Sequence, residues 1–164
     1  MVAGWNYACY LGPPSLPVSE ALADLMPNVL ALYRLRPDQS YDKWFADNPD
    51  ISTIDTVNPY EALFILMAND ADWPQEPAGT PPTGQDLVQL WNSVCYSGQT
   101  KDVPSATASM PGKYDILYLL RPGQGWRRFA PANPEISNLT ELPQFAAVLV
   151  LVNQAGVTHW AFDP

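Results

Sequence analysis

The sequence is short of basic residues, histidine and cysteine, and each shortage excludes a class of function. Its 164 residues include eight Lys and Arg but 17 Asp and Glu, which gives an acidic protein with a net charge of −9 at pH 7. Because nucleic-acid binding depends on clustered cations at the phosphates, we expect no nucleic-acid partner. A single histidine makes a poor metal site, and two cysteines are too few for a disulfide scaffold.

Long apolar runs are also missing. The longest, Ala146 to Val152, is far too short to span a bilayer, so we expect no membrane insertion. The chain instead has 47% hydrophobic residues, 12% aromatic residues and 18 prolines. Such a composition is typical of a globular protein, and this much proline favours short strands and stiff loops over long helices.

The second half of the chain repeats the first at a nearly constant spacing. The recurring pairs include Trp5 and Trp91, Asn6 and Asn92, Cys9 and Cys95, Tyr10 and Tyr96, Tyr33 and Tyr118, Arg36 and Arg121, Pro37 and Pro122, and Asn48 and Asn133. An internal duplication of this kind predicts two copies of one structural unit. We place a first tandem repeat unit at residues 1–72 and a second at 87–164. The proline-rich stretch 73–86 between them is predicted to be an extended connector.

Each unit shows the same order of secondary-structure signals. Aromatic-rich strands come first, at Trp5 to Leu11 and Trp91 to Tyr96. A helix is predicted at Val18 to Met26, because its apolar residues fall on one face, and a shorter one at Val103 to Met110.

Two hairpins and a final strand complete each unit. The hairpins turn at Arg36-Pro37-Asp38-Gln39-Ser40 and at Arg121-Pro122-Gly123-Gln124-Gly125, where proline followed by Asp or Gly favours a β-turn. The final strands, Ala62 to Met67 and Ala147 to Val152, are apolar on both faces and therefore belong inside a layered core. The predicted fold class is α+β and β-dominated, with two tandem β-α-β-β-β units that could share one pseudo-twofold sheet or a barrel.

The order of signals resembles a bacterial cell-surface repeat, in which Gly-Trp-Asn, an Ala/Leu-rich helix, an aromatic hairpin and an Asn-Leu-Thr-x-Leu segment follow one another. The residues that match are Gly4-Trp5-Asn6, Tyr10, Gly12, the helix signal at Val18 to Met26, and Asn138-Leu139-Thr140-Glu141-Leu142. The resemblance implies a secreted protein with an extracellular or cell-surface location and a non-catalytic role.

The duplication also sorts candidate residues. A residue present in both units is most simply required by the shared fold, so the paired aromatics are predicted to be core residues. The alternative is that they form a platform on which sugars stack. Cys9 and Cys95 are likewise predicted to be small buried hydrophobic residues. They could form a disulfide if the units pack about a pseudo-twofold axis near their strands.

Residues that the units do not share supply the candidate sites. The weak candidates for an acid or base are Glu61 and His159, and Arg34 is a further distinctive charge. The candidate ligand-binding residues are Tyr7, Trp73, Arg127, Arg128 and Trp160. No metal site is predicted. The acidic loops Asp47 to Asp50 and Asn69 to Asp72 carry oxygen ligands suited to calcium, but turn formation explains them more simply.

The predicted function is a non-catalytic extracytoplasmic binding or structural module, without a cofactor. Its expected partners are a carbohydrate such as a polysaccharide, a surface protein, or further copies of itself. The alternative is an enzyme acting on a small molecule in an aromatic-lined cavity between the two repeats, with Glu61 or His159 as acid or base.

Overall fold

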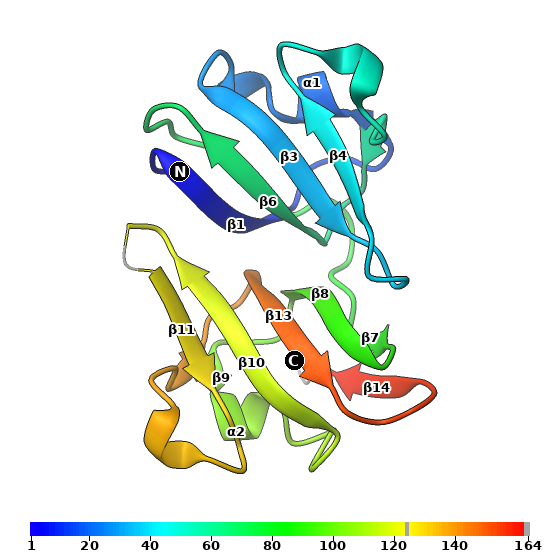
Figure 1. The fold of residues 1–164 in the computed structure, drawn as a ribbon, viewed down its shortest axis with the longest axis vertical. Coiled ribbons are helices and arrows are strands. Elements are labelled where there is room, and N and C mark those ends of the chain that lie inside the picture. The colour runs from blue at the N-terminus through cyan, green and yellow to red at the C-terminus, as the bar shows by residue number, and fades with distance from the viewer. Residues whose placement is uncertain (124, 163–164) are drawn as a thin grey trace.

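The computed structural model describes residues 1–123 and 125–162, and it consists of β-structure with very short helices (Figure 1). In the first half the elements are β1 (Gly4–Tyr10), β2 (Leu16–Pro17), α1 (Val18–Ala21), η1 (Ala23–Leu25), β3 (Val29–Leu35), β4 (Tyr41–Phe45), η2 (Pro49–Ile51), β5 (Thr56–Val57) and β6 (Glu61–Met67). In the second half they are β7 (Gly84–Leu87), β8 (Leu90–Tyr96), β9 (Lys101–Asp102), α2 (Val103–Ala106), β10 (Tyr114–Arg121), β11 (Gly125–Phe129), η3 (Pro134–Ile136), β12 (Glu141–Leu142), β13 (Ala146–Val152) and β14 (Thr158–Ala161). Gln124, in the second predicted hairpin turn, and Asp163 and Pro164 lie outside the described residues.

Two four-stranded antiparallel sheets form the body of the molecule. Their strand orders are β1-β6-β3-β4 and β8-β13-β10-β11, so each strand of one sheet has its sequence equivalent at the same place in the other. β6 and β13 are inner strands because both of their faces are apolar. One face packs on the core of its own unit, and the other faces the opposite sheet (Figure 1).

The predicted fold class is wrong in three respects. The units share neither one sheet nor a barrel, since each keeps its own four-stranded sheet. The helix predicted over Val18 to Met26 is one α-turn followed by a separate 3-10 turn, and the chain enters an extended conformation at Met26 before Pro27. The residue before a proline disfavours helical geometry, and so short a segment gains too few hydrogen bonds to propagate.

Three small two-stranded sheets, β2-β5, β9-β12 and β7-β14, were also not predicted. The β7 strand begins inside the connector predicted at 73–86, and it pairs with β14 near the C-terminal end of the described chain. The repeated structure is therefore a four-stranded antiparallel sheet with short accessory pieces rather than a β-α-β-β-β unit.

The two units are related by a pseudo-twofold axis, because equivalent residues touch each other across their boundary. The pairs are Tyr7 with Ser93, whose oxygens are 2.6 Å apart, Cys9 with Cys95, and Tyr60 with Phe145, whose ring centroids are 6.2 Å apart. Residues meet their own equivalents only close to a twofold axis.

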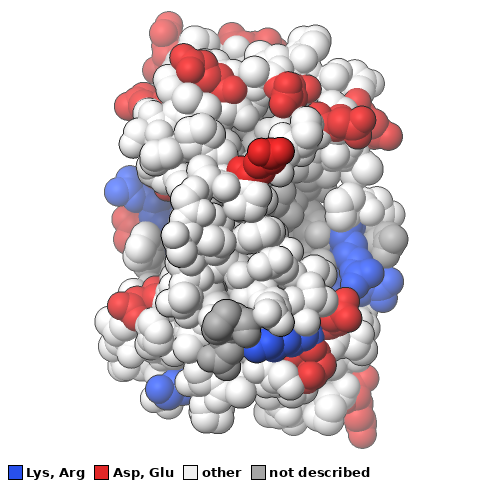
Figure 2. All heavy atoms as spheres, turned by 180° about the vertical axis from the view of Figure 1, so that it is seen from behind, with Lys and Arg blue, Asp and Glu red and all other residues white. Residues whose placement is uncertain are grey.

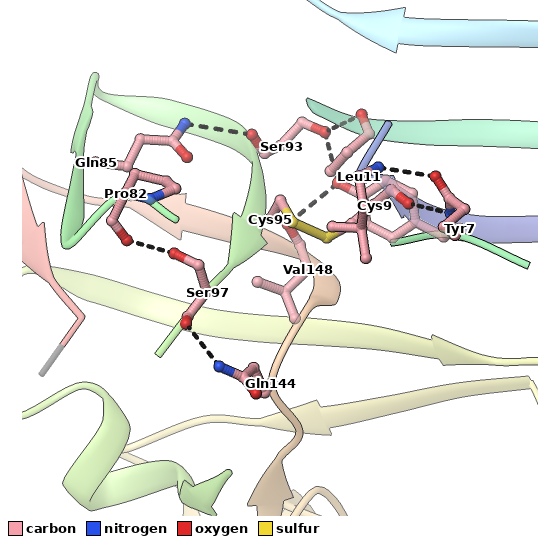
Figure 3. The surroundings of a disulfide bond; sticks show 12 residues. Tyr7, Cys9, Leu11, Pro82, Gln85, Ser93, Cys95, Ser97, Gln144 and Val148 are labelled. Carbon is pink, nitrogen blue, oxygen red and sulfur yellow. Dashed lines mark hydrogen bonds between the residues drawn. A yellow bond between two sulfur atoms is a disulfide. The ribbon is translucent and has the colours of Figure 1, made fainter. Parts of the chain in front are cut away.

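Cys9 and Cys95 form a disulfide close to this axis (Figure 3). Both are buried, in a third hydrophobic cluster that lies between the two sheets and includes Tyr7, Ala62 and Ala147. The favoured interpretation of the cysteines as free buried thiols is thus wrong, and the pairing that depended on a pseudo-twofold axis is what the structure has.

Side chains cover the outer edges of the sheets. On β8, the amide of Gln39 accepts a hydrogen bond from Trp91 N and donates one to Trp91 O, each at 3.0 Å. On the β1 edge, the amide of Gln75 accepts from Leu11 N at 2.8 Å and donates to Cys9 O at 2.9 Å. These amides take the place that a further strand would occupy.

The edges of β4 and β11 are covered by the loops that follow them. The hydroxyl of Thr53 accepts from Lys43 N at 3.0 Å, and Thr53 N donates to Lys43 O at 2.7 Å. Asn138 bonds the equivalent Arg128 through its side-chain oxygen at 2.7 Å and its backbone N–H at 2.9 Å.

Candidate functional site

The sheet faces that look toward each other are not closed along their whole length, and aromatic side chains line the open part. One hollow of about 480 Å³ and a neighbouring one of about 310 Å³ both have Trp126 in their walls. Together they make up the aromatic groove, whose lining residues are Trp5, Tyr33, Tyr41, Phe64, Trp91, Tyr118, Leu120, Trp126 and Leu149.

The aromatic rings of the groove contact one another in a continuous series that crosses from one unit to the other. Centroid distances are 5.8 Å for Trp5–Tyr33, 6.4 Å for Tyr33–Tyr41, Tyr41–Phe64 and Phe64–Trp126, and 6.0 Å for Trp126–Tyr118 and Tyr118–Trp91. Tyr41, Trp5 and Trp126 are 51%, 50% and 43% exposed. Side chains this large are seldom so exposed without a partner to contact.

The polar atoms on these rings are available to a ligand. Among the described residues, no protein group hydrogen-bonds the indole N–H groups or phenol hydroxyls of Trp5, Trp91, Trp126, Tyr33, Tyr41 and Tyr118. By contrast, the indole of Trp160 donates to Ala106 O at 2.7 Å, and that of Trp73 donates to Ala21 O at 3.2 Å. The groove therefore offers both flat apolar faces and unpaired donors at their rims.

The prediction that paired aromatics are core residues is wrong for this set. It holds for Tyr10 and Tyr96, which are buried inside their own units. Alternation along a strand explains the difference, because Trp5 lies on the opposite face of β1 from Tyr10. That alternation was readable in the sequence, but it does not give the exposure, because Tyr7 lies on the same face of β1 as Trp5 and is buried.

Tyr7 is a core residue near the pseudo-twofold axis rather than a ligand contact. Its hydroxyl lies 2.6 Å from Ser93 Oγ and donates to Val148 O at 3.1 Å (Figure 3). Its ring stacks on that of Phe64. Burial raises the pKa of Tyr7 well above its ordinary value. The equivalent position in the second unit is Ser93, because a second tyrosine there would occupy the space of the Tyr7 side chain.

Trp160 and Trp73 are also positioned by the fold. Trp160 has no exposed surface and packs against Tyr96 and Phe162 in the core of the second unit. Trp73 packs against Tyr10 at the edge of the first core, with a centroid distance of 6.2 Å. A surface ligand does not reach the ring of Trp160, which corrects the prediction for that residue.

The two arginines of β11 lie on opposite faces of their strand. Arg128 is opposite Tyr118 in the register, on the groove-facing side, and its Nε donates to Ile136 O at 2.8 Å. Arg127 is opposite Leu119 and belongs to the other face. The structure therefore places Arg128, but not Arg127, on the groove-facing side of β11, although Arg128 is not among the residues that line the groove.

Glu61 belongs to an ion-pair network specific to the first unit. Arg34 donates to both carboxylate oxygens of Glu61, at 3.2 and 3.0 Å, and to Asp42 at 3.0 Å, and Arg36 donates to Asp42 at 3.0 Å. Burial lowers the pKa of the Arg34 guanidinium, but the charges of Glu61 and Asp42 outweigh this effect and raise it. Asn58 also donates to Glu61, so its carboxylate already has several partners.

A hollow of about 310 Å³ between the units lies beside this network. Its walls include Arg34, Glu61, Asp86 and Ser93. His159 is 63% exposed in its side chain, and its Nδ1 lies 2.7 Å from Asp86 Oδ1 on the paired strand. The hollow thus brings Glu61 near the carboxylate partner of His159.

Metal ligands do not gather in the described part of the chain. Residues 1–123 and 125–162 contain no group of three or more His, Cys, Asp or Glu side chains placed to hold a metal ion. Nor does that part contain a helix long and apolar enough to cross a bilayer. Acidic side chains gather at the end of the molecule formed by the first unit, while most of the middle of that face is uncharged (Figure 2).

Scans against known protein families, curated proteins and solved structures found no match for this chain.

Proposed function

We propose that the protein is a non-catalytic, extracytoplasmic binding module that holds a polysaccharide chain in the aromatic groove. The observation that carries the proposal is the continuous series of exposed and half-buried rings from Trp5 to Trp91, built from both units. A pyranose ring offers a flat C–H face that stacks on an indole or phenol, and its hydroxyls can accept from the unpaired donors at the rims.

The shape of the groove supports a polymer rather than a small molecule. The rings extend across both sheets, and the lining is open along its length instead of enclosing a compact cavity. Trp and Tyr supply large contact areas from side chains with few rotatable bonds, so little conformational entropy is lost on binding. Rings that already contact their neighbours lose even less.

The location outside the cytoplasm is supported by the disulfide. Structural disulfides persist in oxidising compartments and are rare in the cytosol. The resemblance of Gly4-Trp5-Asn6 and the segment Asn138 to Leu142 to bacterial surface repeats points to the same location.

The contacts of Glu61 and His159 favour a binding module over an enzyme. Both oxygens of Glu61 accept hydrogen bonds from Arg34, and His159 lies on an exposed strand where its contact is Asp86. A catalytic base needs an open approach to substrate, and both oxygens of Glu61 already accept from one guanidinium nitrogen of Arg34, so this carboxylate stabilises the fold first.

Binding to immobilised neutral and acidic polysaccharides, followed by titration with soluble oligosaccharides, tests the proposal. Trp5→Ala and Trp126→Ala should each weaken binding by about fivefold or more, which corresponds to about 1 kcal/mol per stacking contact. Ile51→Ala is the matched control, because Ile51 is exposed in η2 but is not part of the groove. Unchanged affinity in both tryptophan variants would remove the groove from the function.

A further inference from the structure

The groove-facing sides of the two sheets carry an unexpected charge. By strand alternation, these sides consist of every second residue of the eight long strands, starting from Trp5 in the first sheet and Trp91 in the second. At the paired positions of these strands, the charged residues on the groove-facing sides are Lys43 and Arg128, and no Asp or Glu is among them. Asp115 lies at the β-bulge of β10, where the alternation is interrupted. In a chain with 17 acidic and eight basic residues, this distribution is the reverse of the average surface.

Lys43 and Arg128 occupy equivalent positions in the two units. Lys43 pairs with Tyr33 in the register of β3 and β4, and Arg128 pairs with Tyr118 in the register of β10 and β11. Each cation therefore stands beside a ring of the groove. The ammonium of Lys43 also lies 5.9 Å from the centre of the Phe45 ring.

Neither cation is neutralised by a residue that the structure describes. Among the described residues, the ion pairs involve Arg34, Arg36 and His159, and none involves Lys43 or Arg128. The guanidinium of Arg128 is held by the backbone carbonyl of Ile136, which orients it without cancelling its charge. Two cations that pair in register with groove tyrosines, one of them oriented by a backbone carbonyl, are suited to an anionic partner.

Building on the proposed function, we infer that the polysaccharide is an acidic one, whose sugar rings stack in the aromatic groove while its carboxylate or sulfate groups bind Lys43 and Arg128. The rest of the protein is strongly negative and does not attract a polyanion at long range. An acidic polysaccharide must therefore be held by local contacts with Lys43 and Arg128. The acidic groups of the polymer contribute favourable binding energy only where they contact Lys43 and Arg128.

Matched polymers that share a backbone but differ in charge separate this inference from the proposed function. Polygalacturonate is compared with its fully methyl-esterified form, and carboxymethyl cellulose with methyl cellulose. The wild-type protein should bind the acidic member of at least one pair several-fold more tightly, and the preference should shrink as salt is added.

Variants locate the source of the preference. Lys43→Gln and Arg128→Gln should each reduce it about two- to fivefold, measured as the ratio of the affinities for the acidic and the neutral polymer. Arg127→Gln is the matched control, because Arg127 is the adjacent arginine on the opposite face of β11.

The binding results distinguish the acidic specificity from the proposed function. Equal affinity for the acidic and neutral members of both pairs overturns the acidic specificity but leaves the proposed function intact. Loss of the preference in Arg127→Gln as large as in Arg128→Gln also overturns it. Tighter binding of a single-stranded oligonucleotide of matched charge would assign the groove to nucleic acid instead. Binding to none of the polymers overturns the proposed function together with the inference.

Discussion

Removal of the Cys9–Cys95 disulfide should cost more stability than any other double substitution of comparable size. The bond joins residues that are 86 positions apart in the sequence, so in the unfolded state it closes more than half of the chain into a loop. The loop-entropy relation then gives a stabilisation of about 4.6 kcal/mol for a loop of this length. Such a loss is a large share of the roughly 5–15 kcal/mol that holds a typical domain folded.

The perturbation is Cys9→Ala together with Cys95→Ala, which removes the bond without placing a polar group in the apolar cluster around it. Urea unfolding followed by tryptophan fluorescence measures the change. With a slope of about 2 kcal/mol per molar urea, the midpoint should fall by about 2 M. The wild-type protein treated with reductant should approach the variant, while the variant itself should be insensitive to reductant.

A loss below about 1 kcal/mol would refute the reasoning, because it would mean that the two units are already held together in the unfolded ensemble or that the bond is strained. Two reactive thiols in the denatured, unreduced wild-type protein would refute it more directly. Each unit keeps its own hydrophobic core, so the variant should still fold at low denaturant.

Two further predictions concern buried polar groups. Tyr7→Phe should cost about 1 kcal/mol at neutral pH, because the hydrogen bonds to Ser93 and Val148 are lost. Burial raises the pKa of Tyr7, so above about pH 10 the unfolded tyrosine loses its proton before the folded one, and the wild-type protein should lose stability by up to about 1.4 kcal/mol per pH unit. Urea midpoints between about pH 9 and pH 11 should therefore fall less steeply for Tyr7→Phe, and parallel curves would contradict the assignment. Glu61→Gln should cost about 1–2 kcal/mol, because Arg34 keeps Asp42 but loses the charged carboxylate that accepts from its other guanidinium nitrogen. Glu135→Gln, at an exposed position in η3, is the control, and an equal loss of stability in both variants would show that the Arg34 network contributes nothing.

The duplicated sequence predicted where strands begin and end better than how they are arranged. The apolar segments at Ala62 to Met67 and Ala147 to Val152 are strands, and the hairpin of β3 and β4 lies where the turn at Pro37 predicted it. The prediction of a helix at Val18 to Met26 was wrong because the apolar spacing indicates one buried face but does not require hydrogen bonds between successive helical turns. In the structure Val18, Ala21, Leu22 and Leu25 are buried, but over two separate short turns.

The site was harder to predict, because the sorting by shared residues assumed that each unit stands alone. Near a twofold axis that assumption fails: Tyr7 differs from Ser93 because the two side chains meet each other, not because Tyr7 has a separate function. The same sorting assigned Trp5 and Trp126 to the core, although both are exposed. Only the packing of one sheet against the other determines which face of each strand is left open, and that packing depends on contacts between residues far apart in the sequence.

The glutamine amides on the sheet edges have a consequence for how copies of the protein can assemble. An open edge strand invites a strand from another molecule, and growth in that manner leads to fibres. Gln39 occupies the bonding groups of Trp91, and Gln75 those of Cys9 and Leu11, so a second chain would have to displace them before pairing. Many copies can therefore be crowded on one surface or along one polymer without polymerising through their sheets, and the groove stays free for its ligand.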